Sequence, residues 1–149
     1  YSLFKTFKHN IEGELGVRYL KADSVNSISG VASVAKTWKD FWVNFRAYFI
    51  SDSPNFYTSF NLTSRYYMNH SQDYIMFVAG LGTSPDDRSR LVQFPKLAGL
   101  LTRSVGAGYL KTFKYRTSVG VYGTWINQKI NDTEYQNQYD LYITLQRKF

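Results

Sequence analysis

The stretch Tyr-Asp-Leu-Tyr-Ile-Thr-Leu-Gln-Arg-Lys-Phe, residues 139–149, alternates between apolar and polar residues over its whole length. Successive side chains of a β-strand point to opposite faces, so this stretch predicts a strand with one apolar and one polar face. The apolar face carries Tyr139, Leu141, Ile143, Leu145 and Phe149. Such a strand with an aromatic last residue is typical of the closing strand of an outer-membrane β-barrel. The same alternation also fits a soluble β-sandwich, so the remaining sequence must decide.

The composition favours a membrane barrel over a helical membrane protein. The chain contains 13 Tyr, 11 Phe and 3 Trp, which transmembrane barrels place in girdles at the two membrane interfaces. Its mean hydropathy of −0.36 resembles that of a soluble protein, but half of each barrel strand faces a polar interior. No segment reaches about 18 consecutive apolar residues, so we expect no transmembrane helix. The chain has no Cys, which excludes disulfides and thiolate metal sites.

The basic charge does not by itself indicate nucleic-acid binding. The net charge is +7, but the Lys and Arg residues are dispersed along the chain, without a basic run or a recognisable nucleic-acid-binding motif. We therefore expect no nucleic-acid partner and place the basic groups at a membrane rim or in a barrel lumen.

Strand-like patterns follow one another with hardly a helical period between them. Several reach ten or more residues, whereas strands of soluble sheets usually have about 5 to 6, and long strands suit an apolar band about 25 Å tall. The expected strands are residues 1–7, 11–21, 28–38, 41–50, 56–68, 73–82, 101–113, 115–128 and 139–149.

The connections between these strands fall into two sets at opposite ends of the sheet. If the C-terminus lies in the periplasm, the external connections are 22–27, 51–55, 83–100 and 129–136, and they are longer on average than the periplasmic turns. Single-chain bacterial barrels have an even number of strands, so nine strands predict the C-terminal portion of a larger barrel whose first strands lie outside this chain. In the alternative, residues 1–7 form no barrel strand and eight strands close by themselves.

Three short motifs link the chain to a family. They are Gly16-Val17-Arg18-Tyr19, the segment 64–69 (Ser-Arg-Tyr-Tyr-Met-Asn) and the segment 80–87 (Gly-Leu-Gly-Thr-Ser-Pro-Asp-Asp). With these motifs, residues 11–87 resemble the YaiO-type outer-membrane β-barrel family. The resemblance implies an antiparallel up-and-down transmembrane barrel in the bacterial outer membrane, with further strands at its N-terminus. It implies no activity and no functional residues.

The sequence offers no catalytic constellation. The two histidines, His9 and His70, fall in predicted turns, without an adjacent nucleophile and orienting group. A Gly-x-Ser-x-Gly elbow and a zinc-spaced His pair are both missing from the sequence. We therefore expect no enzymatic activity, no metal and no cofactor.

The polar faces of the predicted strands supply candidate lumen-lining residues. These are Glu12, Glu14, Arg18, Arg46, Arg65, Arg116, Tyr122, Asp140 and Tyr142. Two interpretations are open: a structural network of charge-assisted hydrogen bonds, or a basic lumen that selects anions. Gly106 and Gly108 lie two residues apart on the polar face of one predicted strand. They leave room for a bulky inward side chain such as Tyr122 or Tyr142.

Outward positions supply two further candidates. The long connection contains Asp86, Asp87, Arg88 and Arg90, an external loop that could contact surface glycans or a partner protein. Two adjacent aspartates give too few oxygen ligands for a calcium site. On the predicted lipid face, the small residues Gly30, Ala32 and Val34 form a candidate contact strip.

The sequence thus predicts an all-β, antiparallel transmembrane barrel that acts as a pore or barrel scaffold with an Arg- and Tyr-rich lumen. We expect outer-membrane lipid as its surroundings, and other outer-membrane proteins or surface glycans as contacts. The alternatives are a non-conducting subunit of a larger outer-membrane complex and, less favoured, an enzyme acting on lipid or saccharide at the outer leaflet.

Overall fold

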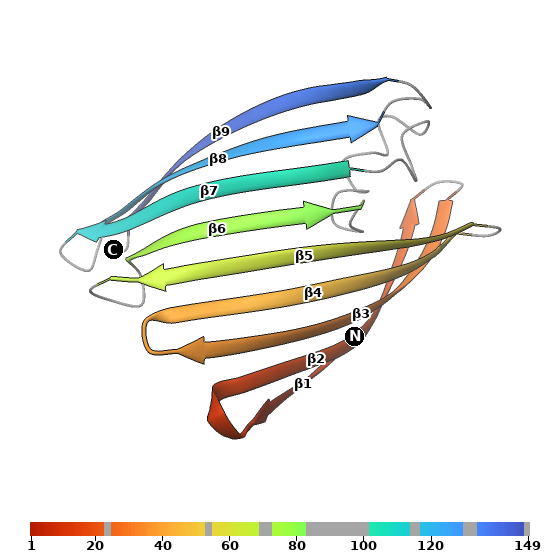
Figure 1. Ribbon diagram of the computed structural model, residues 1–149, viewed down its shortest axis with the longest axis horizontal. Helices are drawn as coiled ribbons and strands as arrows, with labels where there is room; N and C mark the ends of the chain where they lie inside the picture. The colour runs from red at the N-terminus through yellow and green to blue at the C-terminus, as the bar shows by residue number, and fades with distance from the viewer. Residues whose placement is uncertain are drawn as a thin grey trace.

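The computed structural model describes residues 1–22, 25–52, 55–68, 73–82, 102–113, 117–129 and 134–147. They form one antiparallel sheet in which each strand pairs with the next along the chain (Figure 1). A short 3₁₀ turn, η1 (Lys8–Asn10), joins the first two strands. The strands are β1 (Ser2–Phe7), β2 (Ile11–Ala22), β3 (Val25–Trp38), β4 (Phe41–Asp52), β5 (Asn55–Tyr67), β6 (Tyr74–Leu81), β7 (Thr102–Phe113), β8 (Thr117–Lys129) and β9 (Tyr135–Arg147).

The sheet has two chemically different faces, as the period-two alternation predicts. The apolar face carries large exposed side chains, among them Leu15 (68% exposed), Phe45 (45%) and Ile143 (71%). The polar face is much more buried where the strands curve, with Tyr48 at 2% and Ser59 at 1% exposure. The sheet is curved (Figure 1). Side chains crowd on the inner side of a curved sheet, so the more buried polar face is the inner one.

The small core lies on this inner face, on β3, β4 and β5. It consists of Val31, Tyr48 and Ile50, with Tyr57 packed against them. Tyr48 pairs with Val31 on one side and with Ser59 on the other, so neighbouring strands bring these side chains together. Large exposed hydrophobic residues outnumber this core, which is the reverse of a soluble sandwich and suits an apolar exterior.

The expectation of an all-β antiparallel meander is confirmed. β1 pairs with β2 from Ser2 to Phe7, so the alternative in which residues 1–7 form no strand is wrong. Among the described residues, β1 and β9 are the two edges of the sheet and do not pair with each other. The part of the chain that the structure covers contains no helix long and apolar enough to cross a membrane.

Two predicted external loops are wrong in length. The ladder of the β2–β3 hairpin continues to Ala22 and Val25, and that of the β4–β5 hairpin continues to Asp52 and Asn55. Only two residues therefore separate the strands at these points, as few as at the opposite end between β3 and β4. The difference in connection length depends on the β6–β7 and β8–β9 connections alone. We call the end of the strands at which these two connections lie the long-loop end, and the end at which η1 lies the short-turn end.

Candidate functional site on the polar face

A charge-paired row crosses β2, β3 and β4 on the polar face. Glu14 pairs in register with Ser33, and Ser33 pairs with Arg46, so the three side chains lie next to one another. The Oε2 atom of Glu14 accepts hydrogen bonds from Arg46 Nη2 at 2.7 Å and from Ser33 Oγ at 3.1 Å. Glu14 is 4% exposed and Arg46 is 30% exposed, so the pair lies at the boundary between packed wall and open interior.

This row joins two of the candidate lumen-lining residues. Of the four candidate arginines, Arg46 is the one that the register places two strands from Glu14 at the same level of the sheet. Opposite charges at 2.7 Å largely cancel at a distance, so the pair contributes little net field to the interior. The geometry of this pair therefore favours the structural network over the anion-selecting interpretation.

A second group surrounds Arg65 on β5. The guanidinium carbon lies 5.1 Å from the ring centroid of Trp42 on β4 and 5.0 Å from that of Tyr74 on β6. A cation placed within about 6 Å of an aromatic face is attracted by the ring quadrupole. The buried Nε atom of Arg65 has no hydrogen-bond partner within the described part of the chain. Two aromatic rings therefore hold this charge, and no carboxylate of the described residues does.

Two stacked tyrosines continue the polar face on β8 and β9. Tyr122 pairs with Tyr142, and their ring centroids are 6.3 Å apart. Tyr122 lies against β7, where a Cβ atom at Gly106 would come within 2.5 Å of its hydroxyl and one at Gly108 within 2.7 Å of its ring. The space expected at these glycines is thus filled by Tyr122.

The other predicted lumen residues are less closely engaged. Glu12 is exposed on the polar face of β2, and both carboxylate oxygens of Asp140 accept hydrogen bonds from Gln138 Nε2, at 3.0 and 3.1 Å. Arg18 pairs in register with Ser29, but its side chain is outside the described set. Arg116, Asp86, Asp87, Arg88, Arg90 and Phe149 lie outside the described residues. The remaining residues of the terminal strand lie on the exposed apolar face of β9: Tyr139, Leu141, Ile143 and Leu145.

The described polar face is not basic. Its charged side chains are the arginines 46 and 65 and the carboxylates of residues 12, 14 and 140. The surplus of positive charge expected for the lumen is therefore not found in this part of the chain. Within the same residues, no cluster of three or more potential metal ligands occurs.

The sequence analysis missed a buried carboxylate at the short-turn end. Asp73, 1% exposed, precedes β6 and accepts hydrogen bonds from the backbone N–H of Thr112 at 2.6 Å and from Lys111 Nζ at 3.0 Å. Its own carbonyl accepts the N–H of Met68 at 3.0 Å. Asp73 thereby ties the β5–β6 connection to β7. The sequence gives no signal that Asp73 holds these strands together, because its partner Thr112 is 39 residues away along the chain.

The aromatic neighbours of Arg65 were also missed as a group. Alternation places Trp42 and Arg65 on the polar faces of two separate strands, but only the register of the β4–β5 hairpin makes them opposite residues. Tyr74 joins them from β6, where it also contacts Tyr67 at a centroid distance of 5.7 Å.

The comparisons with known proteins agree with this architecture. A sequence model of a protein family, described as the YaiO membrane beta barrel domain, matches residues 1–87. No curated protein and no solved structure matches the chain significantly.

Proposed function

The chain belongs to the YaiO membrane beta barrel domain family, and on this premise we propose that it is a bacterial outer-membrane protein acting as a passive barrel. Its lumen carries a mixed polar lining of arginine, carboxylate and tyrosine side chains, and its exterior contacts lipid. The observation that carries the proposal is the division of the sheet into an exposed apolar face and a polar face that holds Glu14, Arg46 and Arg65.

The lining supports a conduit of weak charge selectivity. The Glu14–Arg46 pair is internally neutral, and the described face also carries Arg65 and the carboxylates of Glu12 and Asp140. Rings of one sign of charge are what make a pore strongly selective, and this part of the face carries both signs. Small polar solutes of either charge therefore suit it better than anions alone.

The barrel acts without catalysis in this proposal. His9 lies in η1 at the short-turn end with a φ angle of 63°, away from the polar groups of the sheet centre. The expected contacts with surface glycans or partner proteins concern the segment of residues 86–90. That segment lies outside the described residues, so these contacts stay a prediction.

The proposal includes additional strands at the two edges of the sheet. In the hydrocarbon region every backbone N–H and C=O must be paired, because no water is available to an open edge. β1 and β9 each leave one side unpaired among the described residues. We therefore place further strands beyond these edges in the assembled barrel, and the nine strands form one wall of it.

Ion conductance through a planar bilayer tests the passive barrel. The full-length protein is refolded, its fold is checked by the heat-dependent shift in gel mobility, and reversal potentials are measured under a salt gradient. We expect weak selectivity in the wild type, a shift towards anions in Glu14→Gln, and a shift towards cations in Arg46→Gln. Arg103→Gln is the matched control, because Arg103 pairs with Leu81 on the apolar face.

Two results contradict the conducting barrel. If Glu14→Gln and Arg46→Gln conduct with the wild-type reversal potential, the polar face of β2–β4 does not line the conducting path. If a correctly folded protein carries no current, the lumen is closed, and the non-conducting subunit of a larger complex replaces the pore.

A further inference from the structure

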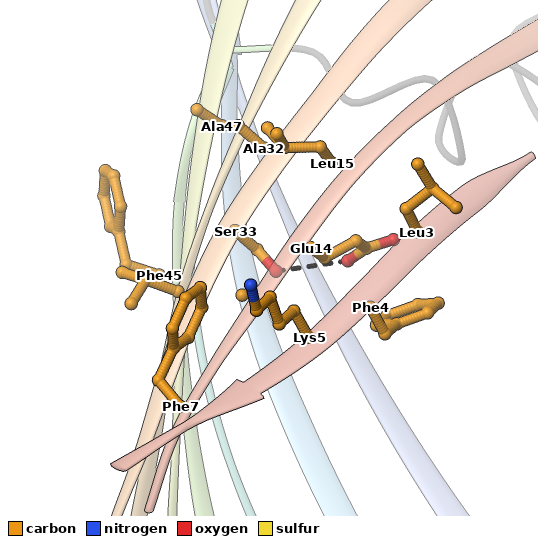
Figure 2. Close-up of a pocket in the computed structure, with 12 residues that line it drawn as sticks. Leu3, Phe4, Lys5, Phe7, Glu14, Leu15, Ala32, Ser33, Phe45 and Ala47 are labelled. Atoms are coloured by element: carbon orange, nitrogen blue, oxygen red, sulfur yellow. Dashed lines mark hydrogen bonds between the residues drawn. The ribbon is translucent and has the colours of Figure 1, made fainter. Parts of the chain in front are cut away.

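A hollow of about 640 Å³ lies against the first four strands, mostly on the apolar face. Its lining includes the small side chains of Ala32 and Ala47 and the larger side chains of Phe7, Leu15 and Phe45 (Figure 2). This volume falls within the range of about 300–1,000 Å³ that is usual for small-molecule sites. Most of its lining residues belong to the apolar face, but Phe4, Glu14 and Ser33 of the polar face also border it.

The register explains why the surface is recessed here. Leu15 pairs with Ala32, and Ala32 pairs with Ala47, so two methyl side chains lie side by side in the middle of the sheet. Towards the short-turn end, the ring of Phe7 overhangs Gly13, where an added Cβ would lie 3.1 Å from Phe7 Cε2. The small side chains of Ala32 and Ala47 thus form a low floor beside Leu15, and the Phe7 ring borders the hollow on the side of the short-turn end.

Basic groups gather where the hollow meets the short-turn end. Lys5 borders the hollow, and Lys36 pairs with Ile11, which in turn pairs with Phe7. Lys8 and Lys39 occupy the adjacent turns, and all four lysines are exposed. None of them forms an ion pair with a described carboxylate. Glu14 also borders the hollow, but Ser33 and Arg46 already satisfy its carboxylate.

We propose that this hollow is a binding site for one anionic phospholipid of the leaflet at the short-turn end. An acyl chain lies over Ala32 and Ala47, beside the Phe7 ring that covers Gly13, and the phosphate lies at Lys5 and Lys36. Lipid tails are as apolar as the wall, so burial gives no hydrophobic gain within the membrane. Retention must come from the fit of the chain to the hollow and from the lysines, whose long side chains reach the interface.

Charge selects this occupant over the others. In a symmetric contact with a second copy of the chain, Lys5 and Lys36 of both copies would lie close together, and their like charges would repel each other. In an anionic phospholipid, the phosphate matches the lysines and the adjoining acyl chain matches the apolar hollow.

Native mass spectrometry of the full-length protein in detergent tests the proposal. The probes are phosphatidylglycerol and phosphatidylcholine with identical acyl chains. We expect one retained phosphatidylglycerol per protein, bound several-fold more tightly than phosphatidylcholine. Removing charge in the double variant Lys5→Ala with Lys36→Ala should reduce that preference, by about five-fold for each lysine.

A filling variant separates the site from general lipid contact. Ala32→Phe places a ring in the hollow and should abolish the retained lipid. Ala107→Phe makes the same change on the apolar face of β7 and should leave it unchanged. Both variants must show the heat-dependent mobility shift of a folded barrel.

The proposal is overturned if the wild type retains no lipid, or if Ala32→Phe and Ala107→Phe retain it equally. A protein dimer that Ala32→Phe dissociates would assign the hollow to a second copy instead. Ion conductance does not enter this test, so its failure is distinguishable from failure of the proposed pore.

Discussion

The polar faces of β2–β4 and of β7–β9 fill the same side of the sheet by different means. On β2–β4, Glu14 and Arg46 pair at 2.7 Å, on the same face as the two largest fully buried side chains, Tyr48 and Ile50. On β7–β9, Tyr122 lies over Gly106 and Gly108 and stacks on Tyr142. The first region depends on matched charge and the second on matched size.

This difference matters because the two solutions fail differently. A charge that loses its partner keeps its desolvation cost, whereas a tyrosine that loses its space can turn or displace a neighbour. The β2–β4 region should therefore respond to charge changes and the β7–β9 region to changes of volume. On the apolar face, the same substitution should have the same effect in both regions.

The largest expected effect comes from a charge placed on the apolar face, which should cost the same in both regions. Phe45→Arg on β4 and Val121→Arg on β8 each place a charge on the apolar face, and each should cost about 2–4 kcal/mol near the middle of the membrane. Urea unfolding in lipid vesicles measures the loss. Arg46→Ala, next to Phe45 but on the opposite face, is the control and should still assemble. A charge tolerated at either apolar position would contradict the assignment of that face to lipid.

The next effect tests the charge-dependent region. Arg46→Ala leaves the carboxylate of Glu14, 4% exposed, without its cationic partner and with only neutral donors such as the Ser33 hydroxyl, and should lower the free energy of unfolding by about 1–3 kcal/mol. Adding Glu14→Gln to this variant should restore part of the loss, because the unpaired charge is removed. A double-mutant cycle measured by urea unfolding gives the coupling. A coupling energy near zero would show that the pair is solvated and that the region does not depend on it.

The smallest effect tests the size-dependent region. Gly106→Ala brings a methyl group within 2.5 Å of the Tyr122 hydroxyl, so the ring must shift, at about 1 kcal/mol. Tyr122→Ala in the same chain should remove part of the conflict and leave the contact with Thr124 Cγ2 at 2.6 Å, so the two changes together should cost less than their sum. Gly123→Ala is the control, because the nearest atom to its added Cβ is 3.9 Å away. Equal losses for the two glycine variants would mean that strand propensity, and not the tyrosine, sets the cost.

Much of the fold could be predicted from the sequence because alternation is a local property. The run Phe41, Val43 and Phe45 against Trp42, Asn44 and Arg46 identifies both faces of β4 without knowledge of any neighbour. The nine strands and their order follow from such runs. The turns between β2 and β3 and between β4 and β5 were predicted too long, because polar residues near a hairpin tip continue the ladder as readily as they leave it.

The candidate site could be predicted only in part. Glu14, Arg46, Arg65, Tyr122 and Tyr142 were assigned to the polar face by alternation, and the spacing of Gly106 and Gly108 indicated the place of a large side chain. The balance of charge on that face was not predictable, since it depends on which carboxylate meets which arginine. Asp73 gave no sequence signal, because its partners lie on a strand that is distant along the chain.

The sequence by itself determined the two faces, the strands and the family of this protein, since each is written in the identity and spacing of neighbouring residues. The tertiary structure alone decided the cross-strand partners: Glu14 with Arg46, Arg65 between Trp42 and Tyr74, and the recess over Ala32 and Ala47. The physical reason is register. Sliding one strand past its neighbour by two residues leaves every side chain on its own face and changes every partner.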